Sequence, residues 1–200
     1  GITQFEKTPL FLAYLASSPI GDLNIETALI SFRRLYLKSV LDFNFSPISY
    51  KFLEHLIQQV HINEFVYYES TEESAFIGRL SEQISNYLVH KNSLPRHLVT
   101  ALALYRDVSS YSWVNFLVGH PDFKTIYRLH IEEPRIESEL KTTIISDSVD
   151  QETSKKVKSQ YEQYPYPRWI KTPLNPDPIS IKELSISQRL NIRTNNTESD

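Results

Sequence analysis

Apolar residues recur at three- and four-residue spacing over much of the chain, which is the pattern of amphipathic helices. Thr8-Pro9 predicts a first helix, because a capping hydroxyl precedes a proline at the first helical position. Asp22 or Asn24 can cap a second helix, and Ser46-Pro47 repeats the cap–proline signal before a third. The apolar positions of these three segments are Leu10, Phe11, Leu12, Tyr14 and Leu15; Ile25, Leu29, Phe32, Tyr36 and Val40; and Phe52, Leu53, Leu56, Ile57 and Val60.

A capping box at residues 70–73, Ser-Thr-Glu-Glu, predicts the start of a fourth helix, and a fifth begins near Pro95. Three shorter helices are predicted over residues 112–117, 123–129 and 133–140, with breaks at the prolines in positions 121 and 134. The apolar positions of the fourth and fifth helices are Phe76, Leu80, Ile84, Tyr87 and Leu88, and Leu98, Ala101, Leu102 and Tyr105.

These helices predict an irregular all-α domain around one core, with no substantial sheet. At least five helices are expected between residues 8 and 107. Arg33, Arg34 and Lys38 lie off the apolar stripe and are expected near the helix end, where cations suit the dipole. The side chains expected to be buried are Leu53, Leu56, Phe76, Leu80 and Leu102.

Composition narrows the class of protein. The 200 residues are 40% hydrophobic and 12% aromatic, which is enough to bury a core. A net charge of -3 provides no general attraction for nucleic acid or an anionic membrane. The chain has no cysteine, which excludes disulfide scaffolds, cysteine-ligated metal sites and thiol catalysis. No apolar run approaches the roughly 18 residues of a membrane span, and no signal peptide opens the chain, so a cytoplasmic protein is predicted.

Glycine is scarce, and this excludes several kinds of ligand site. Only Gly1, Gly21, Gly78 and Gly119 occur, and no two of them are close. Loops that cradle phosphate groups need several neighbouring glycines, because a Cβ would block the approach of the backbone N–H groups. The chain therefore contains neither a P-loop nor a dinucleotide-binding fingerprint.

The pattern changes after residue 145, and three regions are predicted: a helical domain over 1–145, a short helix and aromatic arm over 146–170, and a polar linker over 171–200. Five of the 11 prolines fall between residues 165 and 178, which favours a stiff extended segment. The chain starts on Gly1 and ends in a polar run, which we interpret as a fragment of a longer protein.

Few residues qualify as candidates for chemistry. His61 and Glu64 are three residues apart on a helix, but no third and fourth ligand accompany them, so no metal is predicted. The other interpretation is a half-buried histidine that bonds across its helix. The pairs Glu72-Glu73 and Glu132-Glu133 are interpreted as a helix cap and a solvated face, and no catalytic residue is predicted.

The arm contains three tyrosines and Trp169 within residues 161–169, which is a large aromatic surface to leave in water. Two interpretations stay open. The arm packs back on its own helices, or it docks on a surface that this chain does not contain.

Residues 154–169 carry the pattern Ser-x-x-Val-Lys-x-Gln-Tyr-Glu-x-x-Pro-Tyr-Pro-Arg-Trp. This pattern resembles a motif that precedes the catalytic domain in a bacterial family of class I S-adenosylmethionine-dependent methyltransferases, many of which carry tetratricopeptide repeats. The segment His61–Tyr67 followed by Glu72-Glu73 resembles a second block of that family, and Glu133-Pro134-x-x-Glu137 a weaker third. Residues 163–164 depart from the family motif, and neither its glycine loop nor its repeats occur in these 200 residues.

The resemblance implies a non-catalytic N-terminal helical domain of such a methyltransferase, which serves substrate binding, association or capping of a catalytic domain in cis. It implies S-adenosylmethionine as cofactor of the parent protein, with none bound by this fragment. Tyr166, Arg168 and Trp169 are the cofactor-binding residues that it suggests. Protein substrate or self-association are the other expected partners, with no nucleic acid and no membrane. The alternative is a stand-alone helical interaction module without enzymatic activity.

Overall fold

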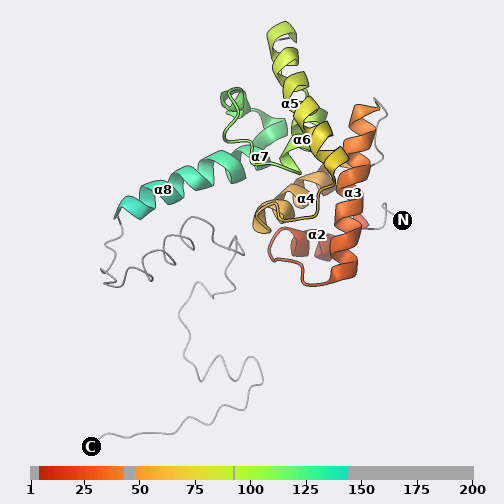
Figure 1. The fold of residues 1–200 in the computed structure, drawn as a ribbon. Helices are drawn as coiled ribbons and strands as arrows, with labels where there is room; N and C mark the ends of the chain where they lie inside the picture. Colours follow the sequence, from red (N-terminus) through yellow and green to blue (C-terminus); the bar gives the residue numbers. More distant parts are fainter. Residues whose placement is uncertain (1–4, 43–47, 92, 144–200) are drawn as a thin grey trace, which may run out of the picture. The chain divides into compact units, whose positions relative to one another are not determined.

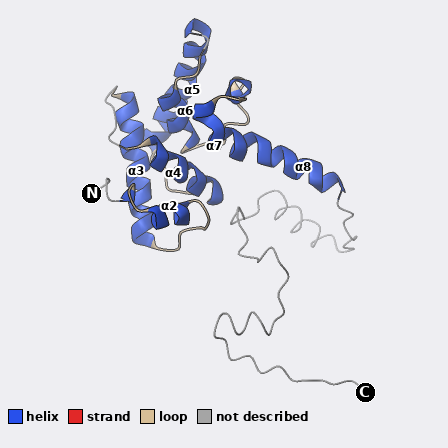
Figure 2. Ribbon diagram, turned by 180° about the vertical axis from the view of Figure 1, so that it is seen from behind, coloured by secondary structure: helices blue, strands red, loops and turns tan. Residues whose placement is uncertain are grey.

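The computed structural model describes residues 5–42, 48–91 and 93–143, and in this part of the chain it contains helices and loops but no strand (Figures 1 and 2). The prediction of an all-α domain with several helices is therefore confirmed. The described helices all lie in the first of the two units into which the chain divides, residues 1–170. The second unit, residues 171–200, lies outside the described part.

The first described helices are α2 (Pro9–Leu15), α3 (Leu23–Leu41), α4 (Tyr50–Ile62), α5 (Thr71–Lys91) and α6 (Arg96–Ala103). Helix α2 packs on α4, and α3 packs on both α5 and α6. Helix α6 also contacts α4 and α5, so it lies at the centre of this arrangement. Its hydrophobicity matches this position, because every residue from Leu98 to Ala103 is buried.

The remaining elements form one almost continuous helical run after two short 3-10 turns. The turns are η1 (Val114–Leu117) and η2 (Pro121–Phe123), followed by α7 (Lys124–Tyr127), a π-turn η3 (Arg128–Glu132) and α8 (Glu133–Thr143). The predicted break at Pro134 is wrong. A proline ring crowds the carbonyl four residues earlier, here that of His130, and the wider π-turn at this position accommodates it.

Two of the predicted helix starts are confirmed in detail. The side chain of Asp22 accepts hydrogen bonds from the N–H groups of Asn24 (2.8 Å) and Ile25 (3.0 Å) and so caps α3. At α5 the Glu73 N–H donates to Ser70 Oγ (3.2 Å) and the Ser70 N–H donates to Glu73 Oε2 (2.9 Å). These reciprocal bonds form a complete capping box.

Two other starts differ from the prediction. Helix α4 begins at Tyr50, not at Ser46-Pro47, and its cap is Ser49, whose Oγ accepts from the Phe52 N–H at 3.3 Å. Helix α2 begins at Pro9 as predicted, but the Thr8 side chain makes no capping hydrogen bond. Proline at this position lacks one of the N–H groups that otherwise need a partner at a helix start.

The core is one cluster of apolar side chains, and it contains most of the predicted residues. Leu53, Leu56, Leu80 and Leu102 are fully buried, as predicted. Phe76 is only partly buried, because the first turns of α5 bury Glu73 and Ile77, whereas Leu80 and Ile84 of the predicted stripe are buried as expected. The largest correction concerns Arg33, which the sequence places on the outside and which is 1% exposed. No described helix is both long and apolar enough to cross a membrane.

Replacing Leu80 by Ala removes a fully buried side chain from the centre of the core. We expect the free energy of unfolding to fall by about 2–5 kcal/mol, because the transfer energy is lost and a cavity is left. Chemical denaturation followed by circular dichroism measures it. Leu35→Ala on α3 is the matched control, since Leu35 is 53% exposed and its loss should change stability by less than about 0.5 kcal/mol. Equal losses for the two variants would contradict this description of the core.

Candidate functional site

Five polar side chains gather where α3, the start of α5 and the end of α6 meet, and we call them the Arg33–Glu73 cluster. Its members are Arg33, Glu69, Glu73, Tyr105 and Arg106. They come from three separate stretches of sequence, so the cluster forms only when these helices have packed. Burying polar groups of this kind costs stability, and their hydrogen bonds and ion pairs offset that cost.

Glu73 is the centre of the cluster, and its carboxylate is 4% exposed. Besides the capping bond from Ser70, it accepts hydrogen bonds from Tyr105 Oη (2.7 Å) and Arg34 (3.1 Å). Burial alone would raise the pKa of Glu73, but the hydrogen bonds from Ser70, Tyr105 and Arg34 outweigh burial and lower the pKa to about 2. A carboxylate with so low a pKa is a weak base, and its oxygens already accept three hydrogen bonds from within the chain, which fits a structural role.

Arg33 brings a positive charge into the same interior. Its guanidinium donates to the backbone oxygen of Tyr68 at 2.6 Å and lies 4.0 Å from the ring centroid of Tyr105 and 5.9 Å from that of Tyr67. Burial lowers the pKa of Arg33, while Tyr105, Glu73 and Glu69 oppose this effect. Arginine keeps its proton even so, and the charge is compensated by the carbonyl, the two rings and the carboxylates.

A bidentate ion pair closes the outer side of the cluster. Arg106 donates to the two carboxylate oxygens of Glu69 at 2.5 and 2.7 Å, and Ser74 Oγ donates to the same carboxylate at 2.5 Å. The hydrogen bonds from Arg106 are the main reason that the pKa of Glu69 is lowered. The pair ties the segment before α5 to the segment after α6.

A cavity of about 390 Å³ opens beside the cluster, between α3 and the start of α5. Its walls carry two cationic side chains from successive turns of α3, Arg34 and Lys38, and the aromatic rings of Tyr68 and Phe76. Arg34 is half-exposed and uses one nitrogen on Glu73. This mixture of charge and aromatic surface suits the binding of a polar ligand. The other residues that line the cavity are Leu37, Ser70, Glu72 and Glu73.

Two buried histidines form a second polar group, distinct from the cluster. The rings of His61 and His130 stack with centroids 5.3 Å apart, and Phe65 packs its edge against both. The Val108 N lies 3.1 Å from His130 Nδ1, and Asp107 Oδ1 lies 3.6 Å from the same nitrogen. The stack joins α4 to the π-turn, so His61 is a packing residue that is fully buried, not half-buried as predicted.

The connection between α4 and α5 is held in a strained conformation. Glu64 and Phe65 have φ angles of 49° and 58°, in the left-handed region that side chains other than glycine avoid. The Phe65 N–H donates to Val60 O at 2.9 Å and the Glu64 N–H to His61 O at 3.1 Å, which is a Schellman motif. The motif aims Phe65 at the histidine stack.

The structure tests the sequence-predicted site residues only in part. In the described ranges no group of three or more potential ligands gathers, so His61 and Glu64 lack further ligands there. The three residues suggested as cofactor-binding, Tyr166, Arg168 and Trp169, lie outside the described residues.

Sequence reasoning assigned Glu73 only to the helix cap and placed Arg33 on the outside, so it missed the burial of both. Both occupy apolar stripes at helical spacing: Glu73 precedes Ile77 by four residues, and Arg33 lies midway between Leu29 and Leu37. That spacing is a usable signal, because a charged residue within a buried stripe needs a partner of opposite charge elsewhere in the chain.

Comparison with known proteins places the chain in no family. No family model, no curated protein and no solved structure matches it.

The low pKa of Glu73 makes stability depend on pH. The unfolded carboxyl titrates near 4.5 and the folded one near 2, so the stabilisation is present above pH 4.5 and is lost as the pH falls toward 2. A shift of this size corresponds to about 3 kcal/mol. Glu73→Gln should therefore lower the free energy of unfolding by about 2–3 kcal/mol at pH 7, with a smaller deficit at pH 3, as measured by urea denaturation.

Glu72→Gln is the matched control, because Glu72 is the preceding residue and is exposed. Its stability should follow that of the unmodified chain within about 0.5 kcal/mol at both pH values. A deficit of Glu73→Gln that is the same at pH 7 and pH 3 would show that the carboxylate charge is not what stabilises the cluster.

Proposed function

We propose that this chain is a non-catalytic helical domain of an S-adenosylmethionine-dependent methyltransferase. In this proposal the methyl group is transferred by a catalytic domain in cis, and the helical domain serves substrate binding, association or capping of that domain. In this proposal the protein works in the cytoplasm.

One observation carries the proposal. The segment 61–73, which resembles the methyltransferase family, supplies the helix cap, the strained turn and the buried carboxylate that join α4 to α5 and α6. Residues used in this way determine a fold, not a reaction. The resemblance is thus best explained if this chain shares with the methyltransferase family the whole helical domain and, after it along the chain, the arm motif at residues 154–169.

The cavity beside the Arg33–Glu73 cluster favours substrate binding among the three proposed roles. It presents the cations of Arg34 and Lys38 on one wall and the aromatic rings of Tyr68 and Phe76 nearby. Because Glu72 and Glu73 line the same cavity, the surface suits a polar part of an acceptor that both donates and accepts hydrogen bonds, and the catalytic domain would methylate that acceptor elsewhere.

Cofactor binding tests the proposal directly. Titration calorimetry with S-adenosylmethionine is done on the 200-residue chain and on the longer product encoded by the same reading frame. We expect no binding by the 200-residue chain, because it lacks a glycine-rich loop, and binding with methyl transfer by the longer product.

Two outcomes would overturn the proposal. Micromolar binding by the 200-residue chain itself would mean that the helices form a cofactor site. A reading frame without a glycine-rich strand–loop–helix would instead favour the alternative, a stand-alone helical interaction module.

For the arm we propose that Tyr166, Arg168 and Trp169 cross to the catalytic domain and cover the cofactor or the acceptor. Residues just before the first strand of such domains lie near the cofactor cleft, at the carboxyl ends of the strands. Tryptophan would supply buried area there, and arginine a bidentate contact to a carboxylate.

The paired change Arg168→Ala/Trp169→Ala in the longer protein should lower cofactor affinity and methyl transfer at least tenfold, measured by calorimetry and by transfer of a radioactive methyl group. Leu10→Ala, an 81% exposed residue on α2, serves as control and should leave both unchanged. If both quantities survive the paired change within about twofold while the fold is intact, the arm is only a tether.

A further inference from the structure

Nδ1 of the buried His130 ring faces a hydrogen-bond donor and an acceptor at the same time. The Val108 N lies 3.1 Å from Nδ1, and Asp107 Oδ1 lies 3.6 Å from it. Because a ring nitrogen either carries a proton or offers a lone pair, Nδ1 can bond only one of the two. The Val108 N–H is within hydrogen-bond distance and the carboxylate is not, so Val108 is the partner in this structure. Asp107 is the alternative partner.

The Asp107 carboxylate stays ionised and is connected to water. Burial alone would raise the pKa of Asp107, but the neighbouring His130 and the Ser109 N–H outweigh burial and hold the pKa well below its usual range. The Ser109 N–H donates to Asp107 Oδ1 at 2.7 Å. The side chain of Asp107 is 47% exposed, whereas that of His130 is completely buried. The carboxylate therefore links the buried ring to the solvent and can accept from it whenever the ring takes up a proton.

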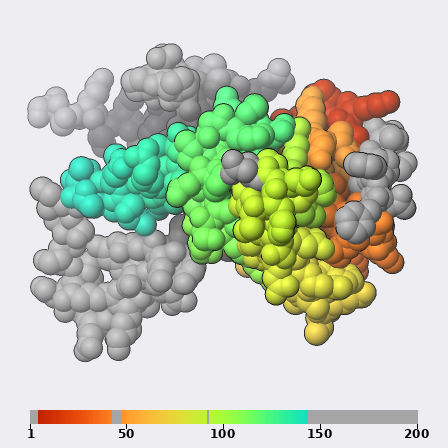
Figure 3. Space-filling model, turned by 90° about the horizontal axis from the view of Figure 1, so that it is seen from above, coloured from red at the N-terminus to blue at the C-terminus, as the bar shows by residue number. Residues whose placement is uncertain are grey.

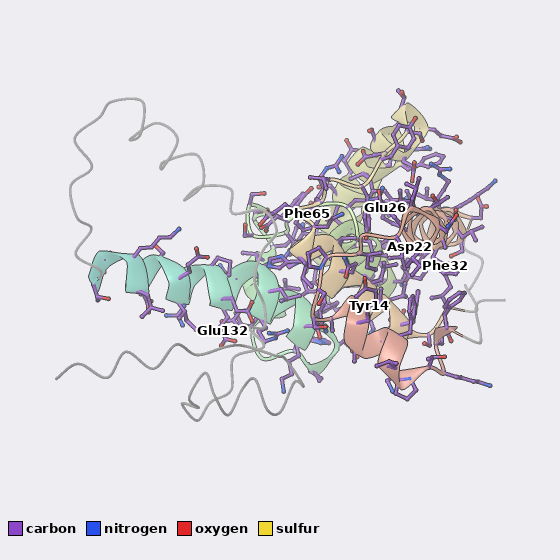
Figure 4. All side chains as sticks on the ribbon, turned by 90° about the horizontal axis from the view of Figure 1, so that it is seen from below. Tyr14, Asp22, Glu26, Phe32, Phe65 and Glu132 are labelled. Atoms are coloured by element: carbon purple, nitrogen blue, oxygen red, sulfur yellow. The ribbon has the colours of Figure 1, made fainter. Side chains whose placement is uncertain are left out.

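Charged and titratable groups surround His130 on several elements. They are Asp107 after α6, His61 on α4, Glu64 on the connection after α4, and Tyr127, Arg128, Glu132 and Glu133 on its own helical run. Figure 4 labels Phe65 and Glu132, which mark the connection and the π-turn that meet at this ring. The His61 ring stacks on His130 with centroids 5.3 Å apart, so a charge on one ring opposes a charge on the other.

The bonding of the His130 ring is decided at Nδ1. Its other nitrogen, Nε2, has no hydrogen-bond partner among the described residues. The carboxylate that the structure places against a nitrogen of this ring is that of Asp107. A change in the protonation of His130 therefore acts on Asp107 and Val108, which are neighbours in the chain.

We propose that His130 is a pH-sensitive switch, which exchanges the Val108 N–H for the Asp107 carboxylate as its partner when the pH falls. The ring takes up one proton from water, and Nδ1 changes from acceptor to donor. A charged pair of this kind has an N–O distance of about 2.7–2.9 Å, so the ring and the carboxylate approach each other by about 0.8 Å. The buried Val108 N–H loses its acceptor, and the peptide between residues 107 and 108 moves to find another. Acid favours this second state because it holds one more proton.

The switch lies at a junction between two parts of the domain. His130 belongs to the π-turn, which leads directly into α8. In Figure 3 the part of the chain drawn in green, which holds the segment after α6 and α7, forms one packed block with the base of α8. On the other side, Asp107 directly follows Arg106, whose guanidinium bonds both oxygens of Glu69. A proton on His130 thus acts on the base of α8 and on the outer ion pair of the Arg33–Glu73 cluster.

Nuclear magnetic resonance of the 200-residue chain tests the proposal between about pH 8 and pH 5. Two-bond correlation spectra of the imidazole rings report, for each histidine, which nitrogen carries a proton. We expect His130 Nδ1 to be unprotonated at the upper pH and protonated at the lower one. The Val108 amide resonance should move with the same midpoint, and its protection from hydrogen exchange should fall at least tenfold. His90, an exposed ring on α5, is the internal control, and its titration should leave Val108 unchanged.

Asp107→Asn tests the identity of the second partner, since it keeps the size of the side chain and removes its charge. Because the carboxylate favours the protonated ring, its loss should shift the Val108 transition to lower pH by at least about one unit. Glu132→Gln is the matched control, because Glu132 is two residues from His130 but Asp107 is the carboxylate that faces Nδ1. It should shift the transition by less than about 0.3 units. His130→Asn should abolish the transition, because an amide does not titrate.

Several results would overturn the proposal. One is a His130 ring that carries a proton on Nδ1 over the whole pH range, or on neither occasion. Another is a ring that gains its proton while the Val108 amide keeps its resonance and its protection. A third is a Val108 transition that Asp107→Asn leaves at the same pH while circular dichroism shows a folded chain. Should a variant fail to fold, the titration of the unmodified chain still decides, because the first two results need no substitution.

Discussion

A buried positive charge determines how the helices of this domain pack. Arg33 is almost completely inaccessible, so α3 can lie against α5 and α6 only when the guanidinium finds compensation there. The compensation comes from the Tyr68 carbonyl, the faces of Tyr67 and Tyr105, and the field of Glu73. The directional contacts of a guanidinium restrict how these helices can slide against each other more than an apolar residue in the same place would.

Glu73 connects local and tertiary structure, because one carboxylate serves both. It completes the capping box of α5 and accepts bonds from Tyr105 and Arg34 on other elements. The helix start and the packing of three helices therefore depend on the same ionised group. The same carboxylate also fixes the Arg34 side chain, which lines the neighbouring cavity together with Glu72 and Glu73.

The features that the sequence predicted well are those with local causes. The cap at Asp22 and the capping box at Ser70 need only neighbouring residues, and they appear where expected. The burial of Arg33 could not be read from its neighbours, because its partners lie about 35 and 70 residues away in the chain. Pro134 shows a third case: it was expected to break a helix, but the π-turn that precedes it accommodates the ring. The candidate cavity escaped prediction for the same reason, since its walls meet only in three dimensions.

The turn after α4 links the two halves of the domain through strain. Glu64 and Phe65 hold left-handed conformations that cost about 1–2 kcal/mol each, and the packing of Phe65 on His61 and His130 offsets this cost. If the π-turn loosens, the strained connection at Glu64 and Phe65 loses its support. That connection positions the segment that leads to Ser70 and the cap of α5. Residues 60–73 and 128–132 should therefore open and close as one cooperative unit in hydrogen exchange, although more than 50 residues separate them in the sequence.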